Sequence, residues 1–296
     1  MRILYATDGR PPAIAAGTLI GRLAAPERAK ITILHAAEYG NPVVAARYGN
    51  RVVEEAEAAL AEAGLSCEVV MSQEGPIPSI ELELAAGDHG LTVVGAGNHP
   101  WFDRLVFGSV STYLLHEAAT PVLVVHRAPD PEHDPVRVLI GTDGSAPAAG
   151  AVDALIAVTA PELVQVHVIS VAEPTVFPLW VHPGGVDLDP LGRQLREQHL
   201  DEAGLPVDAA LERLRSEGFS AEGTIAQGPA ATEILDRASE VGADIVVVGA
   251  RGLGAIARLT VGSVSGHLAR TAPATLVSRV ATAGSGELDR SEGATS

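Results

Sequence analysis

A glycine pattern occurs twice in this chain at a fixed interval, and it constrains the fold more than any other feature. Gly249-Ala250-Arg251-Gly252 is followed by nine residues and then by Gly262-Ser263. A near copy, Gly95-Ala96-Gly97-Asn98, nine residues and Gly108-Ser109, lies 154 positions earlier (249 − 95), and both copies follow a short aliphatic run. Glycines let a backbone come close to a bound group, and the free amides at a helix start attract anions. The pattern therefore predicts a buried strand, a phosphate-binding loop and a helix in each copy.

A second repeat divides the chain into two similar halves. The segment from Arg2 to Gly9 aligns with the segment from Arg137 to Gly144. A charged, proline-rich stretch between the halves is typical of a linker, and the end of the chain, rich in glycine, serine and glutamate, is typical of disorder. We therefore predict a first domain at 1–127, a linker at 128–135, a second domain at 136–280 and a disordered tail at 281–296.

Apolar periodicity predicts alternating strands and helices in both halves. Strands are expected at 2–6, 31–36, 66–71, 91–95, 122–126, 136–142, 164–171, 220–226, 244–249 and 275–280. Helices are expected at 12–23, 41–63, 78–87, 109–118, 146–158, 191–217, 230–241 and 263–271. Apolar residues make up 47% of the chain and aromatic residues only 3%, which favours aliphatic parallel sheets covered by helices. The expected fold class is α/β, with two doubly wound domains and helices on both faces of each sheet.

Composition argues against several functions. A formal net charge of −17 disfavours nucleic acid and membrane surfaces as partners. Lys30 is the only lysine, so the chain cannot contain a G-x-x-x-x-G-K-[ST] loop. The single cysteine, Cys67, gives no disulfide within the chain, and the ten histidines lack metal-ligand spacing, so we predict no metal site built by the protein. Because no leader or membrane-spanning run is evident, we expect a soluble, cytoplasmic protein.

Polar residues end the first predicted strand of each half, as Thr7-Asp8-Gly9 and Thr142-Asp143-Gly144. In open α/β sheets, ligands bind at the carboxyl ends of strands where the strand order reverses. If the first and fourth strands are neighbours, the carboxylate faces the glycine loop. That arrangement suits a nucleotide, with the carboxylate at the adenosine end and the loop with Ser109 or Ser263 at the phosphates. The alternative is that each aspartate only caps the following helix.

Both halves resemble universal stress protein domains of the ATP-binding type, whose phosphate loop reads G-x2-G-x9-G-[ST]. Gly249, Gly252, Gly262 and Ser263 match this pattern in full, and Asp143-Gly144-Ser145 matches the Asp-Gly-Ser of the family. The resemblance covers about residues 1–127 and 136–280. It implies a five-stranded parallel sheet of order 3-2-1-4-5 in each half, and pairing of the halves through their fifth strands.

Carried onto this sequence, the resemblance implies two ATP sites. The second-half site would comprise Thr142, Asp143, Val171, Gly249, Gly252, Gly262, Ser263, Val264 and Ser265. The first-half site would comprise Thr7, Asp8, Ala36, Gly95, Asn98, Gly108, Ser109, Val110 and Ser111. Asn98 replaces the second glycine of the pattern; asparagine tolerates a left-handed backbone better than most residues, whereas His99-Pro100-Trp101 makes the loop bulkier. The occupancy of the first site stays open at this point.

The resemblance also implies a function. ATP would bind with Mg²⁺ or Mn²⁺ on its phosphates, and the protein would act as a regulator or sensor in the stress response. The chain would form a pseudo-dimer by itself, with a homodimer of two chains as a further possibility. Because the pattern includes no catalytic base or lysine, we expect at most slow ATP hydrolysis. Two alternatives stay open: a slow ATPase or nucleotidyl-transfer enzyme of the same wider fold, and a nucleotide-free interaction module.

Overall fold

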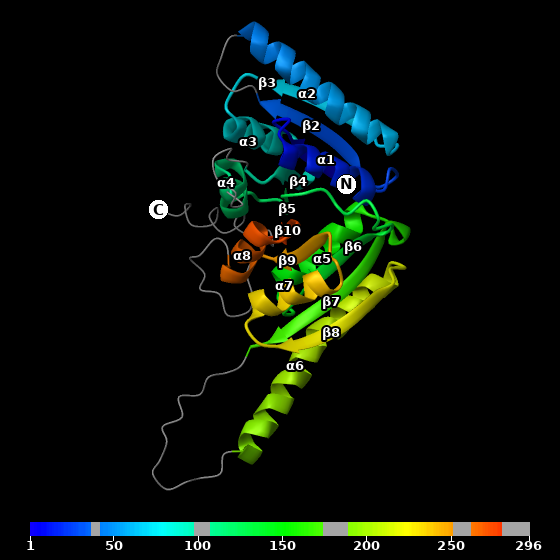
Figure 1. The fold of residues 1–296 in the computed structure, drawn as a ribbon, viewed down its shortest axis with the longest axis vertical. Helices are drawn as coiled ribbons and strands as arrows, with labels where there is room; N and C mark the ends of the chain where they lie inside the picture. The colour runs from blue at the N-terminus through cyan, green and yellow to red at the C-terminus, as the bar shows by residue number, and fades with distance from the viewer. Residues whose placement is uncertain (37–41, 98–106, 174–188, 251–261, 280–296) are drawn as a thin grey trace, which may run out of the picture.

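The computed structural model describes residues 1–36, 42–97, 107–173, 189–250 and 262–279. Within them, ten strands and eight α-helices alternate along the chain (Figure 1). Every predicted strand and helix is present, with both ends within two residues of the prediction. The two sequence repeats thus correspond to two repeated sets of elements, whereas the predicted tail and parts of both glycine loops lie outside the described residues.

The first half alternates five strands with four helices. Its elements are β1 (Arg2–Ala6), α1 (Pro11–Leu23), β2 (Lys30–Ala36), α2 (Pro42–Glu62), β3 (Cys67–Ser72), α3 (Pro76–Ala86), β4 (His89–Gly95), α4 (Ser109–Glu117) and β5 (Val122–Val125). The second half repeats this order. Its elements are β6 (Val136–Gly141), α5 (Ala146–Val158), β7 (Val164–Ala172), α6 (Asp189–Ser216), β8 (Ala221–Gln227), α7 (Ala230–Glu240), β9 (Ile245–Gly249), α8 (Ser263–Thr271) and β10 (Ala274–Ser278).

All ten strands belong to one sheet with the order β3-β2-β1-β4-β5-β10-β9-β6-β7-β8. Each half therefore reads 3-2-1-4-5 and is parallel throughout, as predicted. The halves join through an antiparallel pair of fifth strands, in which Leu123 lies opposite Leu276. We call this pair the seam. All residues of β5 and β10 are buried, so each strand covers an apolar edge that would otherwise be exposed.

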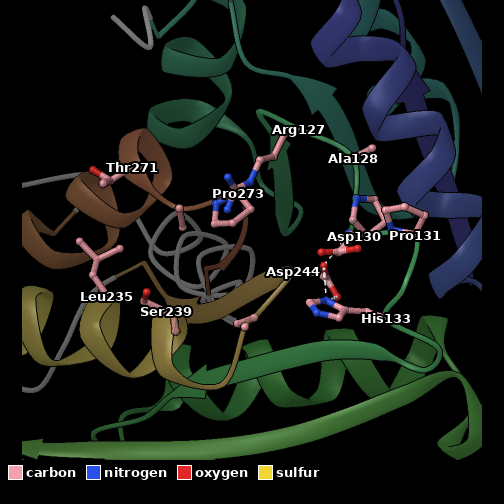
Figure 2. Close-up of a pocket in the computed structure, with 15 residues that line it drawn as sticks. Arg127, Ala128, Asp130, Pro131, His133, Leu235, Ser239, Asp244, Thr271 and Pro273 are labelled. Carbon is pink, nitrogen blue, oxygen red and sulfur yellow. Dashed lines mark hydrogen bonds and ion pairs between the residues drawn. The ribbon is translucent and has the colours of Figure 1, made fainter.

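The segment predicted as a linker is fastened to both halves (Figure 2). The carboxylate of Asp244 accepts hydrogen bonds from the backbone nitrogen of Asp130 at 2.9 Å and from Nδ1 of His133 at 3.0 Å. Arg22 of α1 donates to the carbonyl oxygens of Asp130, at 2.7 Å, and His133. A cavity of about 820 Å³ lies beside this segment, between the linker and the ends of α7 and α8. None of the predicted binding residues lines it.

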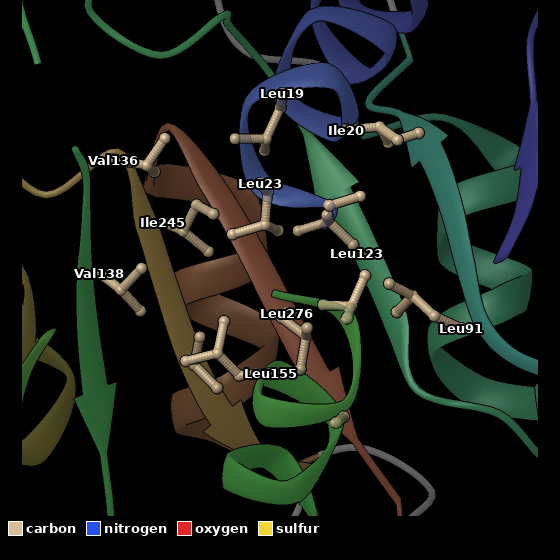
Figure 3. Close-up of a cluster of buried hydrophobic side chains, with 14 of the residues drawn as sticks. Leu19, Ile20, Leu23, Leu91, Leu123, Val136, Val138, Leu155, Ile245 and Leu276 are labelled. Carbon is tan, nitrogen blue, oxygen red and sulfur yellow. The ribbon is translucent and has the colours of Figure 1, made fainter. Parts of the chain in front are cut away.

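The core consists of two apolar layers, one on each face of the sheet. One layer packs α1, α2, α5 and α6 against the sheet, and the other packs α3, α4, α7 and α8. The first layer is continuous across the seam, where Leu23 of α1 and Leu155 of α5 gather with Leu123 and Leu276 (Figure 3). At its end, Arg28 donates to the carbonyl oxygen of Ile156 at 3.0 Å. The two halves therefore share one continuous sheet and one continuous apolar layer.

No helix in the described parts of the chain is both long enough and apolar enough to span a bilayer.

Candidate functional site

The strand order of each half reverses between the first and fourth strands. In the first half, β1 pairs with β2 on one side and with β4 on the other. The chain leaves β1 toward α1 on one face of the sheet and leaves β4 toward α4 on the other face. The two connections therefore separate at the carboxyl ends of β1 and β4, which opens a cleft where open α/β sheets bind ligands.

A cavity of about 170 Å³ lies at this position in the first half. Of the nine residues predicted for the first site, eight line it, and the ninth, Asn98, lies outside the described residues. The eight are Thr7, Asp8, Ala36, Gly95, Gly108, Ser109, Val110 and Ser111. The structure thus brings together residues from the ends of three strands and from the start of a helix.

The remaining lining was not predicted from the sequence. Pro76 and Ile80 come from the first turns of α3, and Arg10 comes from the turn before α1. Every helix of a half begins at the same edge of the parallel sheet, so the Gly75-Pro76 helix start after the third strand was a usable signal for this wall. Ala6, Ala13, Leu34, Val94, Ala96 and Gly97 complete the lining.

The glycines that end β4 and β9 serve the packing of a helix. A Cβ on Gly95 would lie 2.4 Å from the backbone nitrogen of Ala13, in the first turn of α1. A Cβ on Gly249 would lie 2.6 Å from the backbone nitrogen of Ala148, in the first turn of α5. Real Cβ atoms do not approach backbone this closely, so only glycine lets these helices start against the strand ends. The sequence analysis predicted both glycines as ligand contacts, and the structure adds that each is required for a helix to pack against the strand end.

Gly108 has a different role, because it lies inside the cavity wall. A Cβ there would lie 2.8 Å from Cα of Gly97, so the glycine loop and the start of α4 touch backbone to backbone. Gly108 is also the N-cap of α4, and among the described residues no side chain caps the start of this helix. The first amides of α4 therefore keep their hydrogen-bonding capacity and the positive end of the helix dipole at the cavity.

The serines of each Gly-Ser-Val-Ser sequence differ in function. Ser109 and Ser263, at the first positions of α4 and α8, are exposed. Ser111 and Ser265 are buried, and their hydroxyls donate to backbone carbonyl oxygens: Ser111 to Gly108 at 3.1 Å, and Ser265 to Ala250 at 2.8 Å. The second serine of each sequence therefore fixes the loop, whereas the first is accessible to a ligand.

The aspartates predicted to meet the nucleoside do not cap the helices. Asp8 accepts a hydrogen bond from the backbone nitrogen of Arg10, and Asp143 accepts one from that of Ser145, each at 3.0 Å. The N-cap residues are Arg10 for α1 and Ser145 for α5, and Oγ of Ser145 accepts from the backbone nitrogen of Ala148 at 3.4 Å. Each aspartate therefore shapes the turn before the helix, two residues from the cap.

The turn that carries Asp8 is held by side chains of α2 and β2. Tyr48 of α2 donates its hydroxyl to the carbonyl oxygen of Asp8 at 3.0 Å, and Nδ1 of His35 donates to that of Thr7 at 2.9 Å. Beneath the same turn, burial raises the pKa of Tyr5, whose hydroxyl donates to the carbonyl oxygen of Ala13 at 2.6 Å. These contacts join residues far apart in the sequence, and no sequence pattern indicated them.

The charge at the two sites differs. Arg10 lines the first cavity, and its Nε lies 3.7 Å from the carboxylate of Asp8. Both side chains are more than half exposed, so this ion pair contributes little to stability and can rearrange around a ligand. At the equivalent turn of the second half, the neutral Ser145 is buried.

The second half has the same framework at equivalent positions. Thr142 follows β6, and Val171 lies near the end of β7. Gly262 is the N-cap of α8, and among the described residues no side chain caps this helix start. The backbone nitrogen of Gly262 donates to the carbonyl oxygen of Ala250 at 2.8 Å, which closes the loop at its base. Val264, like Ser263 and Ser265, lies in the first turn of α8. Gly252, which was predicted for the glycine loop of the second site, lies outside the described residues.

Comparison with known proteins agrees with this architecture. The model of the universal stress protein family matches residues 1–126 and 136–277. A universal stress protein of Mycolicibacterium smegmatis is 31% identical over 193 residues, which cover 62% of this chain and 58% of that protein. The universal stress protein Rv2623 of Mycobacterium tuberculosis is 32% identical over 195 residues, covering 62% and 59%. The matched regions thus span less than two thirds of these relatives.

Solved structures share the fold over nearly the whole chain. A universal stress protein from Archaeoglobus fulgidus has a TM-score of 0.64 at 20% identity, covering 94% of this chain and 98% of that one. A universal stress protein from Pseudomonas aeruginosa has a TM-score of 0.61 at 17% identity, covering 93% and 92%. At such identities the likeness establishes the fold alone. Because the family model matches both halves, this chain carries the domain twice and belongs to the universal stress protein family.

Proposed function

We propose that each half of this protein binds one adenine nucleotide, ATP, at the carboxyl ends of its first and fourth strands. The protein would then act as a nucleotide-dependent regulator or sensor in the stress response. The observation that carries the proposal is the first-half cavity, which gathers the Asp8 turn, Ala36 and the Gly108-Ser109 helix start around one space. The residues of the motif lie far apart in sequence, and their convergence on one cavity is what a shared ligand requires.

The chemistry of the cavity fits a phosphorylated ligand. Gly97 and Gly108 both line the cavity without side chains, so a ligand there would face main-chain atoms. The uncapped start of α4 offers amide donors to phosphate oxygens. Arg10 adds a cation in a chain of net charge −17. The phosphates are therefore assigned to the α4 side, and the nucleoside to the side of Asp8 and Ala36.

A divalent cation, Mg²⁺ or Mn²⁺, would be held by the phosphates and would reduce their charge. The residues of this chain would bind and orient the nucleotide: Asp8 or Asp143 through a carboxylate oxygen, and the helix starts through their amides. In the second half the same turn and helix start support the proposal, with Ser145 in place of Arg10.

The lining favours binding over rapid turnover. Lys30 was expected just before the second strand and is instead the first residue of β2, whereas the cavity lies at the last residue, Ala36. At about 3.3 Å per residue the two ends are separated by about 20 Å, so Lys30 does not reach the phosphates. The cavity lining therefore contains no lysine that could neutralise a transferred phosphoryl group.

The deciding experiment is to purify the full chain, denature it, and identify released nucleotide by mass spectrometry with its stoichiometry. We expect two ATP molecules per chain, and one in either Gly108→Val or Gly262→Val. Calorimetric titration of nucleotide-stripped protein with ATP measures the affinity of each remaining site. Absence of nucleotide and of ATP binding in the unaltered chain would refute the proposal, and turnover of many ATP per minute would favour an enzyme instead.

A further inference from the structure

The residue that follows each seam strand reaches across to the other half. His126, directly after β5, donates from Nε2 to the carbonyl oxygen of Ala269, in the last turn of α8, at 2.7 Å. Arg279, directly after β10, donates from its guanidinium to the carbonyl oxygens of His116 and, at 3.4 Å, Ala118, at the end of α4. The contact is reciprocal, because each half caps a helix of the other.

These caps satisfy groups that a helix cannot satisfy by itself. The last four carbonyl groups of an α-helix lack intrahelical partners, and a donor placed there stabilises the helix end and fixes its position. His126 and Arg279 supply that donor to α8 and α4, which are the two helices whose first turns form the proposed phosphate sites. Each helix has nine residues and is therefore about 13 Å long, so its two ends move together as one rigid unit.

The same strand ends also hold the glycine loops. The backbone nitrogen of Ala96 donates to the carbonyl oxygen of Val125 at 2.7 Å, and that of Ala250 donates to the carbonyl oxygen of Ser278 at 2.7 Å. Val125 and His126 are consecutive, as are Ser278 and Arg279. Two neighbouring residues therefore contact the loop of one site and the helix of the other site.

We propose that His126 and Arg279 are positioning residues that couple the two nucleotide sites across the seam. This inference rests on the proposed function. His126 positions α8 for the second site, and Arg279 positions α4 for the first site. When a nucleotide binds against Ala96 or Ala250, the strand end bonded to that residue shifts with it and repositions the helix of the other half. By thermodynamic linkage the effect is mutual, so each occupied site raises the affinity of the other.

The test first compares the ATP affinity per site of the unaltered chain with that of each single-site chain, and coupling makes binding to the unaltered chain tighter. Equal affinities would contradict the coupling. The test then measures the positioning of each site separately in the full chain. Gly108→Val leaves only the second site for titration with ATP, and Gly262→Val leaves only the first. In the Gly108→Val chain, we expect His126→Ala to weaken ATP binding about two- to tenfold, the range expected for loss of one hydrogen bond. In the Gly262→Val chain, His126→Ala leaves the affinity unchanged. Arg279→Met gives the opposite result, weakening only the first site.

Two controls separate positioning from general damage to the fold. Arg127→Met removes a cation that directly follows His126. The side chain of Arg127 lines the 820 Å³ cavity and, among the described residues, donates to no carbonyl group of α4 or α8. The ATP affinities of both sites therefore stay unchanged in this variant. His126→Gln and Arg279→Lys retain a donor and restore most of the lost affinity. Amide hydrogen exchange provides a readout without ligand, with faster exchange in α8 for His126→Ala and in α4 for Arg279→Met.

The outcomes distinguish this inference from the proposed function. If the unaltered chain binds no adenine nucleotide, the proposed function is wrong, and the coupling is therefore wrong as well. If the unaltered chain binds nucleotide but His126→Ala and Arg279→Met behave like Arg127→Met, the coupling is wrong and the proposed function stands. Equal weakening of both sites by either variant also contradicts it, because a cap acts on one helix.

Discussion

His133 and Asp244 join the linker to the sheet through a hydrogen-bonded pair, 3.0 Å apart, in which the carboxylate is 4% exposed. The same carboxylate also accepts from the backbone nitrogens of Asp130 and Arg137, each at 2.9 Å. One buried side chain therefore fixes both ends of the linker. At the common offset of 154 the equivalent residue of the first half is Gly90, inside β4, which has no side chain that could make these hydrogen bonds.

We predict that Asp244→Ala lowers the free energy of unfolding by about 2–4 kcal/mol, because buried donors that lose their acceptor cost about 1–3 kcal/mol each. Urea denaturation followed by circular dichroism measures this change. Asp88→Ala removes an exposed aspartate just before the fourth strand of the first half and is the matched control, with an expected change under 0.5 kcal/mol. Equal effects of the two substitutions would show that the hydrogen bonds accepted by Asp244 contribute nothing to the free energy of unfolding.

Gly95→Ala and Gly249→Ala should both destabilise the fold, by about 1–3 kcal/mol, because the new methyl group would collide with the first turn of α1 or α5. Gly75→Ala is the control: Gly75 also lies at a helix start, and a Cβ there has only Pro78 nearby, at 3.8 Å. Thermal unfolding of the three variants compares them directly. A melting temperature of Gly95→Ala equal to that of Gly75→Ala would contradict the packing role.

Gly108→Ala should act on binding more than on stability. Its Cβ would lie 2.8 Å from Cα of Gly97, so the loop must move away from the start of α4. We expect ATP affinity at the first site to fall at least tenfold. Titration calorimetry in a Gly262→Val background reports on the first site alone. Retention of full affinity would mean that phosphates do not bind between the loop and α4.

The lowered pKa values of three histidines lead us to predict a loss of stability in mild acid. Burial lowers the pKa of His89, His126 and His167; Arg2 also lowers that of His89, and Arg237 and Arg137 that of His167. A base whose pKa is lower in the folded chain binds fewer protons there than in the unfolded chain, so stability falls as the pH drops through about 6.5. The unfolding free energy at pH 7.5 should therefore exceed that at pH 5.5.

The contribution of one histidine can be isolated by substitution. His89→Gln should reduce the difference in unfolding free energy between pH 7.5 and 5.5, because the glutamine side chain does not titrate. His267→Gln, at an exposed position on α8, should leave that difference unchanged and serves as the control. If both variants keep the pH dependence of the unaltered chain, the origin of the acid effect lies in other groups.

Much of the fold could be predicted because it follows from local repeats. Alternating apolar runs and helix starts gave every element, whereas the strand order whose reversal creates the cleft was implied by the resemblance to universal stress protein domains. The eight described residues predicted for the first site line one cavity because the carboxyl ends of parallel strands meet at one edge, and their role in binding stays a prediction. The prolines and charges at 128–135 predict a linker, and this segment connects β5 to β6.

Contacts between distant segments were not predictable. Composition shows that 128–135 is irregular, but not that Asp244, more than a hundred residues later, holds it. The caps formed by His126 and Arg279 depend on the seam geometry, and a histidine or arginine after a strand gives no signal of its own. Gly95 was predicted as a binding residue, and the structure adds a packing requirement that the sequence did not indicate, because a Cβ there would collide with the backbone of Ala13.

The antiparallel junction of β5 with β10 has a consequence for how this protein behaves at low abundance. Two separate chains joined by such strands would come apart on dilution, because their association depends on concentration. Here a short covalent tether keeps the partners at a high effective concentration, whatever the number of copies in the cell. Both strands already have neighbours on each side, so self-association of this protein must recruit some other surface.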